Sequence, residues 1–104
     1  MKVVWQTNAD RQRDQVAEYI RNEFGSRRRR QFLQNVRKMT QQLKHSPYIG
    51  KIDPLFQNRV QTYRSVIVNG LNKLVYRIEG NTIHIVAFWD TRMEPENLAA
   101  HSLT

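Results

Sequence analysis

The spacing of the apolar residues changes near residue 62 from three or four to two, and this change constrains the fold more than any other feature of the sequence. A spacing of three or four is typical of an amphipathic helix, whereas a spacing of two is typical of a strand with one buried face. The chain is therefore predicted to have an α+β fold, with helices in its first half and an antiparallel sheet in its second.

Two helices are predicted in the first half of the chain. Val16, Ile20 and Phe24 recur at intervals of four, which predicts a helix from about residue 9 to residue 24. A second apolar stripe predicts a helix that ends near Lys44, because Pro47 breaks the pattern. The members of this stripe are Phe32, Val36, Met39 and Leu43, with Leu33 beside them.

The residues at the predicted helix ends suit those positions. Thr7 can act as the N-cap of the first helix, and Ser26 can cap the second. Gly25 suits the left-handed conformation with which many helices end. A Gly-Ser corner between two helices predicts an αα-hairpin.

Turn signals separate the predicted strands. Residues 3–5 form a short β-prone opening, residues 47–61 are predicted to be a loop, and three strands follow. Asn69-Gly70 is the strongest short hairpin signal, and Gly80-Asn81 predicts a second turn. The three strands, which cover residues 63–68, 74–78 and 82–89, are expected to form an antiparallel meander. We expect one domain over residues 1–104: an N-terminal strand, a two-helix hairpin and this three-stranded meander.

Strict alternation divides the predicted sheet into two faces. The more apolar face is expected to pack under the helices and carries Tyr63, Ser65, Ile67, Leu74, Tyr76, Ile78, Ile83, Ile85, Ala87 and Trp89. The mixed face carries Arg64, Val66, Val68, Lys73, Val75, Arg77, His84, Val86, Phe88 and Asp90. One layer of helices cannot cover both faces, so the mixed face is predicted to bind a partner, unless the C-terminal tail folds over it.

Composition excludes several classes of protein. The 104 residues contain no cysteine, which excludes disulfides, thiolate zinc sites and cysteine nucleophiles. The three histidines share no ligand spacing, so neither a metal nor another cofactor is expected. No apolar run reaches the roughly 18 residues of a membrane span, and no signal peptide is recognised. We therefore expect a cytoplasmic protein that does not enter the membrane.

The charge balance points to an anionic partner. The formal net charge is +8, and 11 of the 17 Lys and Arg residues lie within residues 1–50. Such a domain suits nucleic acid or an acidic protein. The four residues Arg27, Arg28, Arg29 and Arg30 are a candidate patch for either, because cations at a helix start are disfavoured by the helix dipole. The alternative is a solvated helix start.

A second group of basic residues is predicted on the sheet. Arg64, Lys73 and Arg77 are expected to converge on the mixed face, where their repulsion would favour a bound anion. Asp90 and Arg92 flank Thr91 and are expected to form a salt bridge at the end of the last strand.

The chain as a whole resembles the RelE/ParE superfamily of bacterial type II toxin–antitoxin toxins, which includes plasmid stabilisation proteins. The resemblance lies in Tyr63-Arg64, in residues 74–79, in Ile83-His84-Ile85 and in Trp89-Asp90-Thr91-Arg92, after the spaced Leu43, Pro47 and Gly50. It implies a helical hairpin on one face of a small antiparallel sheet. It also implies a cognate antitoxin that wraps the toxin with an acidic or amphipathic segment, in a toxin–antitoxin hetero-oligomer.

Within this superfamily, RelE-like members cut mRNA in the ribosome, and ParE-like members inhibit DNA gyrase. RelE-like cleavage would assign catalysis to Arg64, Lys73, Arg77 and Arg92, with His84 as the one titrating group. Cleavage needs a base, stabilisation of the phosphorane charge and an acid. Here Asp90 stands where a basic residue is expected, and Glu96 or Leu98 stands where the aromatic acid–base residue is expected.

This departure favours a ParE-like toxin that acts by binding. An mRNA endoribonuclease and a basic nucleic-acid-binding domain that is not a toxin remain as alternatives. The antitoxin is expected to contact Val66, Val75, His84, Val86, Phe88, Arg64, Arg77 and Arg92. On this assignment, Phe88 lies at the antitoxin surface and Trp89 lies in the helical core.

Overall fold

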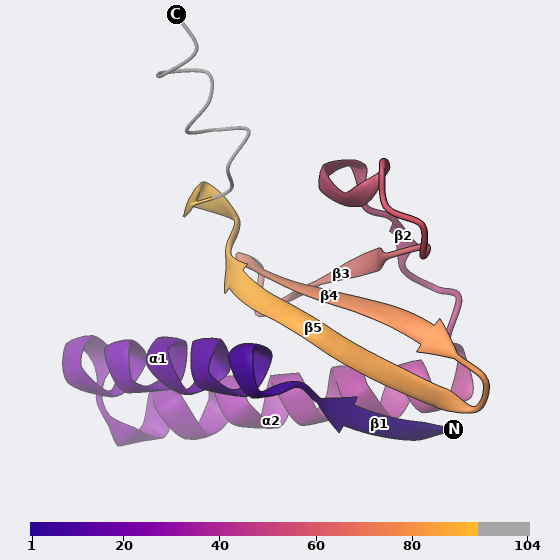
Figure 1. Ribbon diagram of the computed structural model, residues 1–104. Coiled ribbons are helices and arrows are strands. Elements are labelled where there is room, and N and C mark those ends of the chain that lie inside the picture. The colour runs from indigo at the N-terminus through magenta and orange to yellow at the C-terminus, as the bar shows by residue number, and fades with distance from the viewer. Residues whose placement is uncertain (94–104) are drawn as a thin grey trace, which may run out of the picture.

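Two helices lie side by side against one face of a five-stranded sheet in the computed structural model, which describes residues 1–93 (Figure 1). The helices are α1 (Thr7–Phe24) and α2 (Ser26–His45). The strands are β1 (Lys2–Trp5), β2 (Lys51–Ile52), β3 (Arg64–Val68), β4 (Asn72–Glu79) and β5 (Thr82–Asp90). The described residues also contain two short 3₁₀ helices, η1 (Pro54–Phe56) before β3 and η2 (Thr91–Met93) after β5.

The sheet is mixed, and its strand order is β1-β5-β4-β3-β2. The predicted meander is confirmed, because β3, β4 and β5 pair antiparallel in sequence order. The prediction of a three-stranded sheet is incomplete, because β1 adds parallel to β5 and β2 adds antiparallel to β3. The two residues of β2 are too few to show an alternating pattern, which explains why the sequence predicted a loop at this strand.

The helix hairpin is confirmed, but its caps differ from those predicted. Gln6, and not Thr7, occupies the N-cap position of α1, and Gly25 precedes α2, so that Ser26 is its first helical residue. Within the described residues, neither N-terminus has a side-chain cap. Gly25 has a φ of 93°, which fits a glycine at the corner.

The core lies between the helices and the sheet. Its largest buried side chains come from α2, β4 and β5 and include Phe32, Leu43, Leu74, Tyr76 and Phe88. Val16 and Ile20 pack against this core as predicted. Phe24 does not: it is 62% exposed, because the last turn of α1 extends beyond the buried part of the helix.

A β-bulge in β5 reverses the predicted faces at the end of the sheet. Val75 lies opposite Ala87 and Tyr76 lies opposite Ile85, so that Val86 is the extra residue on β5. One extra residue inverts the alternation beyond it. Phe88 therefore points into the helical core and is fully buried, and the assignment of Phe88 to the surface and of Trp89 to the core is wrong.

The predicted faces of β3 are also inverted. Val66 lies opposite Leu74, so Val66 and Val68 face the helices together with Arg64. The opposite side of the sheet, which we call the outer face, carries Lys73, Val75, Arg77, His84 and Trp89, with Ser65 and Ile67 from β3. Tyr63 was predicted in the core, but its ring instead packs against Phe56 of η1, 4.9 Å between centroids.

The side chain of Tyr76, on β4, forms hydrogen bonds with the segment that follows α2. Its hydroxyl donates to the carbonyl of Pro47 at 2.7 Å and accepts from the backbone N–H of Gly50 at 3.0 Å. Burial raises the pKa of this phenol, against the opposing influence of the Gly50 hydrogen bond and of the Arg64 charge, so the group keeps its proton. A Cβ on Gly50 would lie 2.6 Å from this hydroxyl, which explains the glycine.

The Tyr76→Phe substitution is expected to lower the free energy of unfolding by about 1–3 kcal/mol, because the buried Gly50 N–H and Pro47 carbonyl lose this partner. Urea denaturation would measure the change. Tyr48→Phe is the matched control, since Tyr48 is 66% exposed and should change stability by less than about 0.5 kcal/mol. Equal effects of the two substitutions would contradict the assigned role of Tyr76.

Candidate functional site

The basic residues predicted to converge on the sheet lie on opposite faces. Arg64 faces the helices, where its guanidinium donates to the carbonyl of Gly50 at 2.8 Å and lies 5.1 Å from the ring centroid of Tyr48. Lys73 lies on the outer face, where its Nζ is 2.9 Å from Oδ2 of the fully buried Asp53. The prediction that Arg64, Lys73 and Arg77 share one face is therefore wrong for Arg64.

The other predicted cations also have carboxylate partners. Arg77 lies opposite His84 on the outer face, and its guanidinium donates to Glu79 at 2.9 Å. The Nη2 atom of Arg92 lies 2.6 Å from Oδ2 of Asp90, which confirms the expected salt bridge. Hydrogen bonds from Arg92 lower the pKa of the Asp90 carboxyl, against the smaller opposing influence of burial. The candidate catalytic residues thus do not form one convergent cation cluster.

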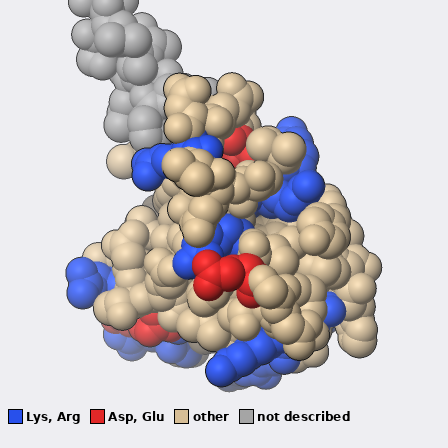
Figure 2. Space-filling model, turned by 45° about the vertical axis from the view of Figure 1, so that its right-hand side comes forward, with Lys and Arg blue, Asp and Glu red and all other residues tan. Residues whose placement is uncertain are grey.

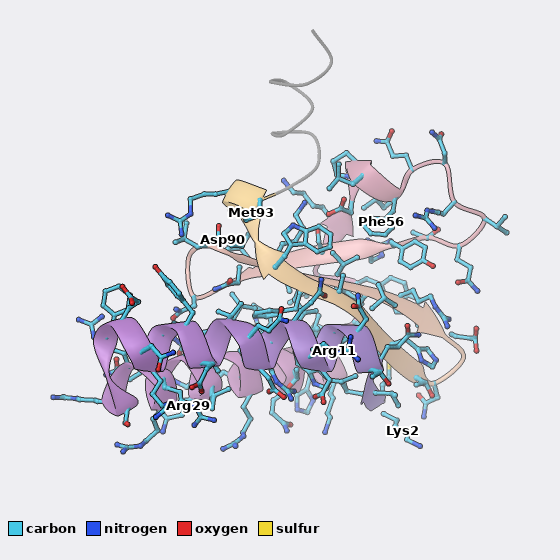
Figure 3. All side chains as sticks on the ribbon, turned by 60° about the vertical axis from the view of Figure 1, so that its left-hand side comes forward. Lys2, Arg11, Arg29, Phe56, Asp90 and Met93 are labelled. Carbon is cyan, nitrogen blue, oxygen red and sulfur yellow. The ribbon has the colours of Figure 1, made fainter. Side chains whose placement is uncertain are left out.

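The predicted partner surface is not continuous. Phe88 and Val75 are fully buried, on opposite sides of the sheet, and Val66 packs toward the helical core. His84 and Val86 are half-buried. The segment around η1 also covers part of the outer face, as the position of Phe56 on the side of the sheet away from the helices shows (Figure 3).

The four residues Arg27, Arg28, Arg29 and Arg30 are all exposed in the first turn of α2. On the face shown in Figure 2, Lys and Arg side chains form several separate groups and not one continuous basic patch. On this face, the separate basic groups suit contacts with individual anionic groups.

A cleft of about 590 Å³ lies between α1, α2 and the β3–β4 turn, and we call it the helix–hairpin cleft. Three large apolar side chains in its wall are solvent-exposed: Tyr19 by 58%, Phe24 by 62% and Leu71 by 44%. Arg28 and Arg92 also line it. An exposed apolar cluster with basic residues at its side is typical of a protein-binding surface.

The local structure explains how these residues come together. Tyr19 and Phe24 form an edge-to-face pair on the last turns of α1, with ring centroids 6.5 Å apart. The β3–β4 turn is joined to α2 by a hydrogen bond from Asn35 Nδ2 to Asn69 Oδ1 of 2.8 Å. Asn69 and Gly70 both have positive φ, as the hairpin signal predicts, and Leu71 follows them.

Sequence reasoning missed this cleft. Phe24 continues the spacing of Val16 and Ile20, and this spacing was interpreted only as one apolar face of a helix. One available signal was Leu71, a large apolar residue directly after an Asn-Gly turn, where solvent exposure is normal. Within residues 1–93, no group of three or more potential metal ligands is found, and no helix is long and apolar enough to cross a membrane.

The fold defines the class: an α+β domain in which an αα-hairpin covers one face of a mixed sheet. A similar fold occurs in a solved structure described as the chromosomal ParDE TA system from P. aeruginosa, with a TM-score of 0.70 and 16% sequence identity. That match covers 86% of this chain and 95% of the other.

The sequence comparisons identify the family. The model of the ParE toxin of the type II toxin-antitoxin system, parDE, matches residues 3–95. The chain therefore belongs to the ParE toxin family, which confirms the resemblance in residue pattern. No curated protein sequence matches it significantly.

Proposed function

We propose that the protein is a toxin that stops bacterial growth by binding a target such as DNA gyrase, and that a cognate antitoxin neutralises it by occupying the helix–hairpin cleft. Family membership supports the toxin role. The observation that carries the site is the exposed apolar cluster of Tyr19, Phe24 and Leu71. The proposed place of action is the bacterial cytoplasm, and the proposed benefit is retention of a plasmid or of the toxin–antitoxin locus.

The chemistry of the cleft favours an amphipathic, acidic antitoxin segment. Its apolar residues would cover Tyr19, Phe24 and Leu71, and burial of such surface contributes roughly 25 cal/mol per Å² before ordering costs. Its carboxylates would approach Arg28 on a protein of net charge +8, whereas Arg92 already pairs with Asp90, which also lines the cleft. These charges would mainly set the orientation and the association rate.

Binding is favoured over RNA cleavage as the mode of action. Arg64 and Lys73 lie on opposite faces, and Asp53 and Asp90 neutralise Lys73 and Arg92. Stabilisation of a phosphorane needs donors aimed at one point. The residues assigned to cleavage do not meet this requirement in the described arrangement.

Expression of the chain without an antitoxin should stop growth, with DNA damage signalling and intact messages. Unchanged growth at high expression would contradict the toxin role. New transcript ends within translated codons would instead favour the endoribonuclease. Mapping of transcript 5′ ends and an in vitro supercoiling assay with gyrase would separate these outcomes.

The double substitution Tyr19→Ala and Phe24→Ala should weaken antitoxin binding at least about tenfold, because buried aromatic anchors carry much of an interface's affinity. Calorimetric titration with the cognate antitoxin would measure the dissociation constant. Tyr48→Ala is the control, since Tyr48 is equally exposed but lies outside the cleft. If Tyr48→Ala weakened binding more than the double substitution did, the antitoxin would bind elsewhere.

A further inference from the structure

We propose that the outer face carries a binding pocket for a phosphate-bearing nucleobase, separate from the helix–hairpin cleft and independent of the toxin role. The pocket has a volume of about 470 Å³ and lies where α1 begins beside β5 and where the η1 segment covers the sheet. Its described lining contains three aromatic rings, two arginines and four carboxamides, but no carboxylate. We call it the aromatic pocket.

The three aromatic rings form a platform for stacking. Phe56 is nearly parallel to Trp89, with an interplanar angle of 21° and centroids 6.4 Å apart. The ring of Tyr63 also packs against Phe56, with ring centroids 4.9 Å apart. All three side chains are half-buried, so part of each remains exposed to a ligand. Base–aromatic stacking is the contact that single nucleotides and single strands share.

Positive charge surrounds this platform. The Arg59 guanidinium lies 5.4 Å from the Phe56 ring centroid and has no ion pair among the described residues. Arg77 also lines the pocket, and its carboxylate partner Glu79 is largely exposed. The N-terminus of α1 lies at the same edge, because Gln6 and Asn8 line the pocket. Its first-turn N–H groups have no side-chain cap, and the one carboxylate of that turn, Asp10, pairs with Arg13.

The carboxamides supply the donors and acceptors that a base edge requires. Gln12 uses its Oε1 to accept from the backbone N–H of Phe88 at 2.8 Å, which leaves its amino group to donate. Gln61, from the loop before β3, also lines the pocket. The indole Nε1 of Trp89 is buried without a hydrogen-bond partner within the described residues.

These features together fit one ligand chemistry. An acidic peptide would use the arginines but would not need a stacked platform, and a neutral aromatic ligand would not need the arginines or the free helix N-terminus. A nucleobase with its phosphate uses all of them: the rings for stacking, the carboxamides for the base edge and the positive groups for the phosphate. The source of this chemistry is either a free nucleotide or a single-stranded nucleic acid.

Calorimetric titration of the purified full chain would test the pocket. The probes are the four ribonucleoside monophosphates, inorganic phosphate, and eight-residue oligomers of dT and U. We expect at least one nucleotide to bind more tightly than inorganic phosphate. Oligomers that bind at least about tenfold more tightly than the monophosphates would identify a single strand as the source, and equal affinities would identify the free nucleotide. Absence of binding by every nucleotide and oligomer at millimolar concentration overturns the proposal.

Matched variants locate the binding. Phe56→Leu keeps an apolar side chain but removes stacking, and Arg59→Gln removes one charge; each should weaken nucleotide binding about tenfold. Their controls are Tyr48→Leu, an exposed aromatic elsewhere, and Arg28→Gln in the helix–hairpin cleft. Circular dichroism would verify that all four variants are folded. Binding that is lost equally in the control variants, or unchanged in Phe56→Leu and Arg59→Gln, overturns the assignment.

Discussion

Replacing Phe88 with alanine is expected to lower the free energy of unfolding by about 3–5 kcal/mol, a large part of the stability of a domain of this size. The Phe88 side chain is fully buried. Its ring centroid lies 6.0 Å from that of Trp5 on β1 and 5.9 Å from that of Phe32 on α2. The substitution would therefore leave a cavity where the edge strand, the sheet and the second helix meet.

Trp89→Ala is the comparison that tests the bulge. Trp89 lies on the outer face and is partly exposed, so its loss is expected to cost only about 1–2 kcal/mol. Urea denaturation of both variants would give the two values under identical conditions. If Trp89→Ala lowered the free energy of unfolding more than Phe88→Ala, this result would contradict the reversal of faces at Val86 and support strict alternation along β5.

Replacing Lys73 with methionine is expected to lower the free energy of unfolding by about 3–5 kcal/mol, because Asp53 would remain as a buried, unpaired charge. The Nζ atom of Lys73 lies 2.9 Å from Oδ2 of Asp53, and the Asp53 side chain is fully buried. Asp53 Oδ1 also accepts from the backbone N–H of Leu55 at 2.9 Å and so holds the start of η1. Loss of the pair would thus loosen the segment that carries Phe56.

A variant that lacks both charges separates the effect of the ion pair on stability from the effect of side-chain packing. The double variant Lys73→Met, Asp53→Leu should be more stable than Lys73→Met alone, because no unpaired charge stays buried. A double variant that is less stable than the single one would contradict this account. Chemical denaturation of the wild type, both single variants and the double variant would complete the cycle.

The same pair predicts how stability depends on pH. Burial raises the pKa of Asp53, but hydrogen bonds from Lys73, Ser65 and the Leu55 amide outweigh it and hold the pKa below its usual value. A carboxyl with a lowered folded pKa stabilises the fold above its unfolded pKa, and this stabilisation is lost as the pH falls through the folded pKa. The wild type should therefore lose stability below about pH 4, and the double variant should lose less over this range. Denaturation curves between pH 6 and pH 2.5 would measure the difference.

The elements of the fold could be predicted from the sequence, but the faces of the sheet could not. Helix spacing and glycine turns are local signals, and both helices and all three meander strands occur close to their predicted residues. The single extra residue Val86 leaves no mark in the alternation of apolar residues around it. Its position depends on which residues of β4 lie opposite β5, and this is a matter of pairing between strands.

The candidate site shows the same limit. Arg64 and Lys73 were predicted to lie on one face of the sheet, yet their strands place them on opposite faces. Asp53 lies in a segment predicted to be a loop, and only the folded chain brings it to Lys73. The helix–hairpin cleft likewise requires Phe24 and Leu71, which are 47 positions apart in the sequence, to lie in one wall.

By itself, the sequence determined the α+β class, the helical hairpin, the meander with its turns, the basic charge and the resemblance to a toxin family. These properties depend on residues close to one another in the chain or on simple counts. Only the tertiary structure decided which side chains are buried, which charges are paired and which apolar residues form an accessible surface. These depend on strand register and on the packing of α1 and α2, where one inserted residue moves a phenylalanine from the outer face into the core.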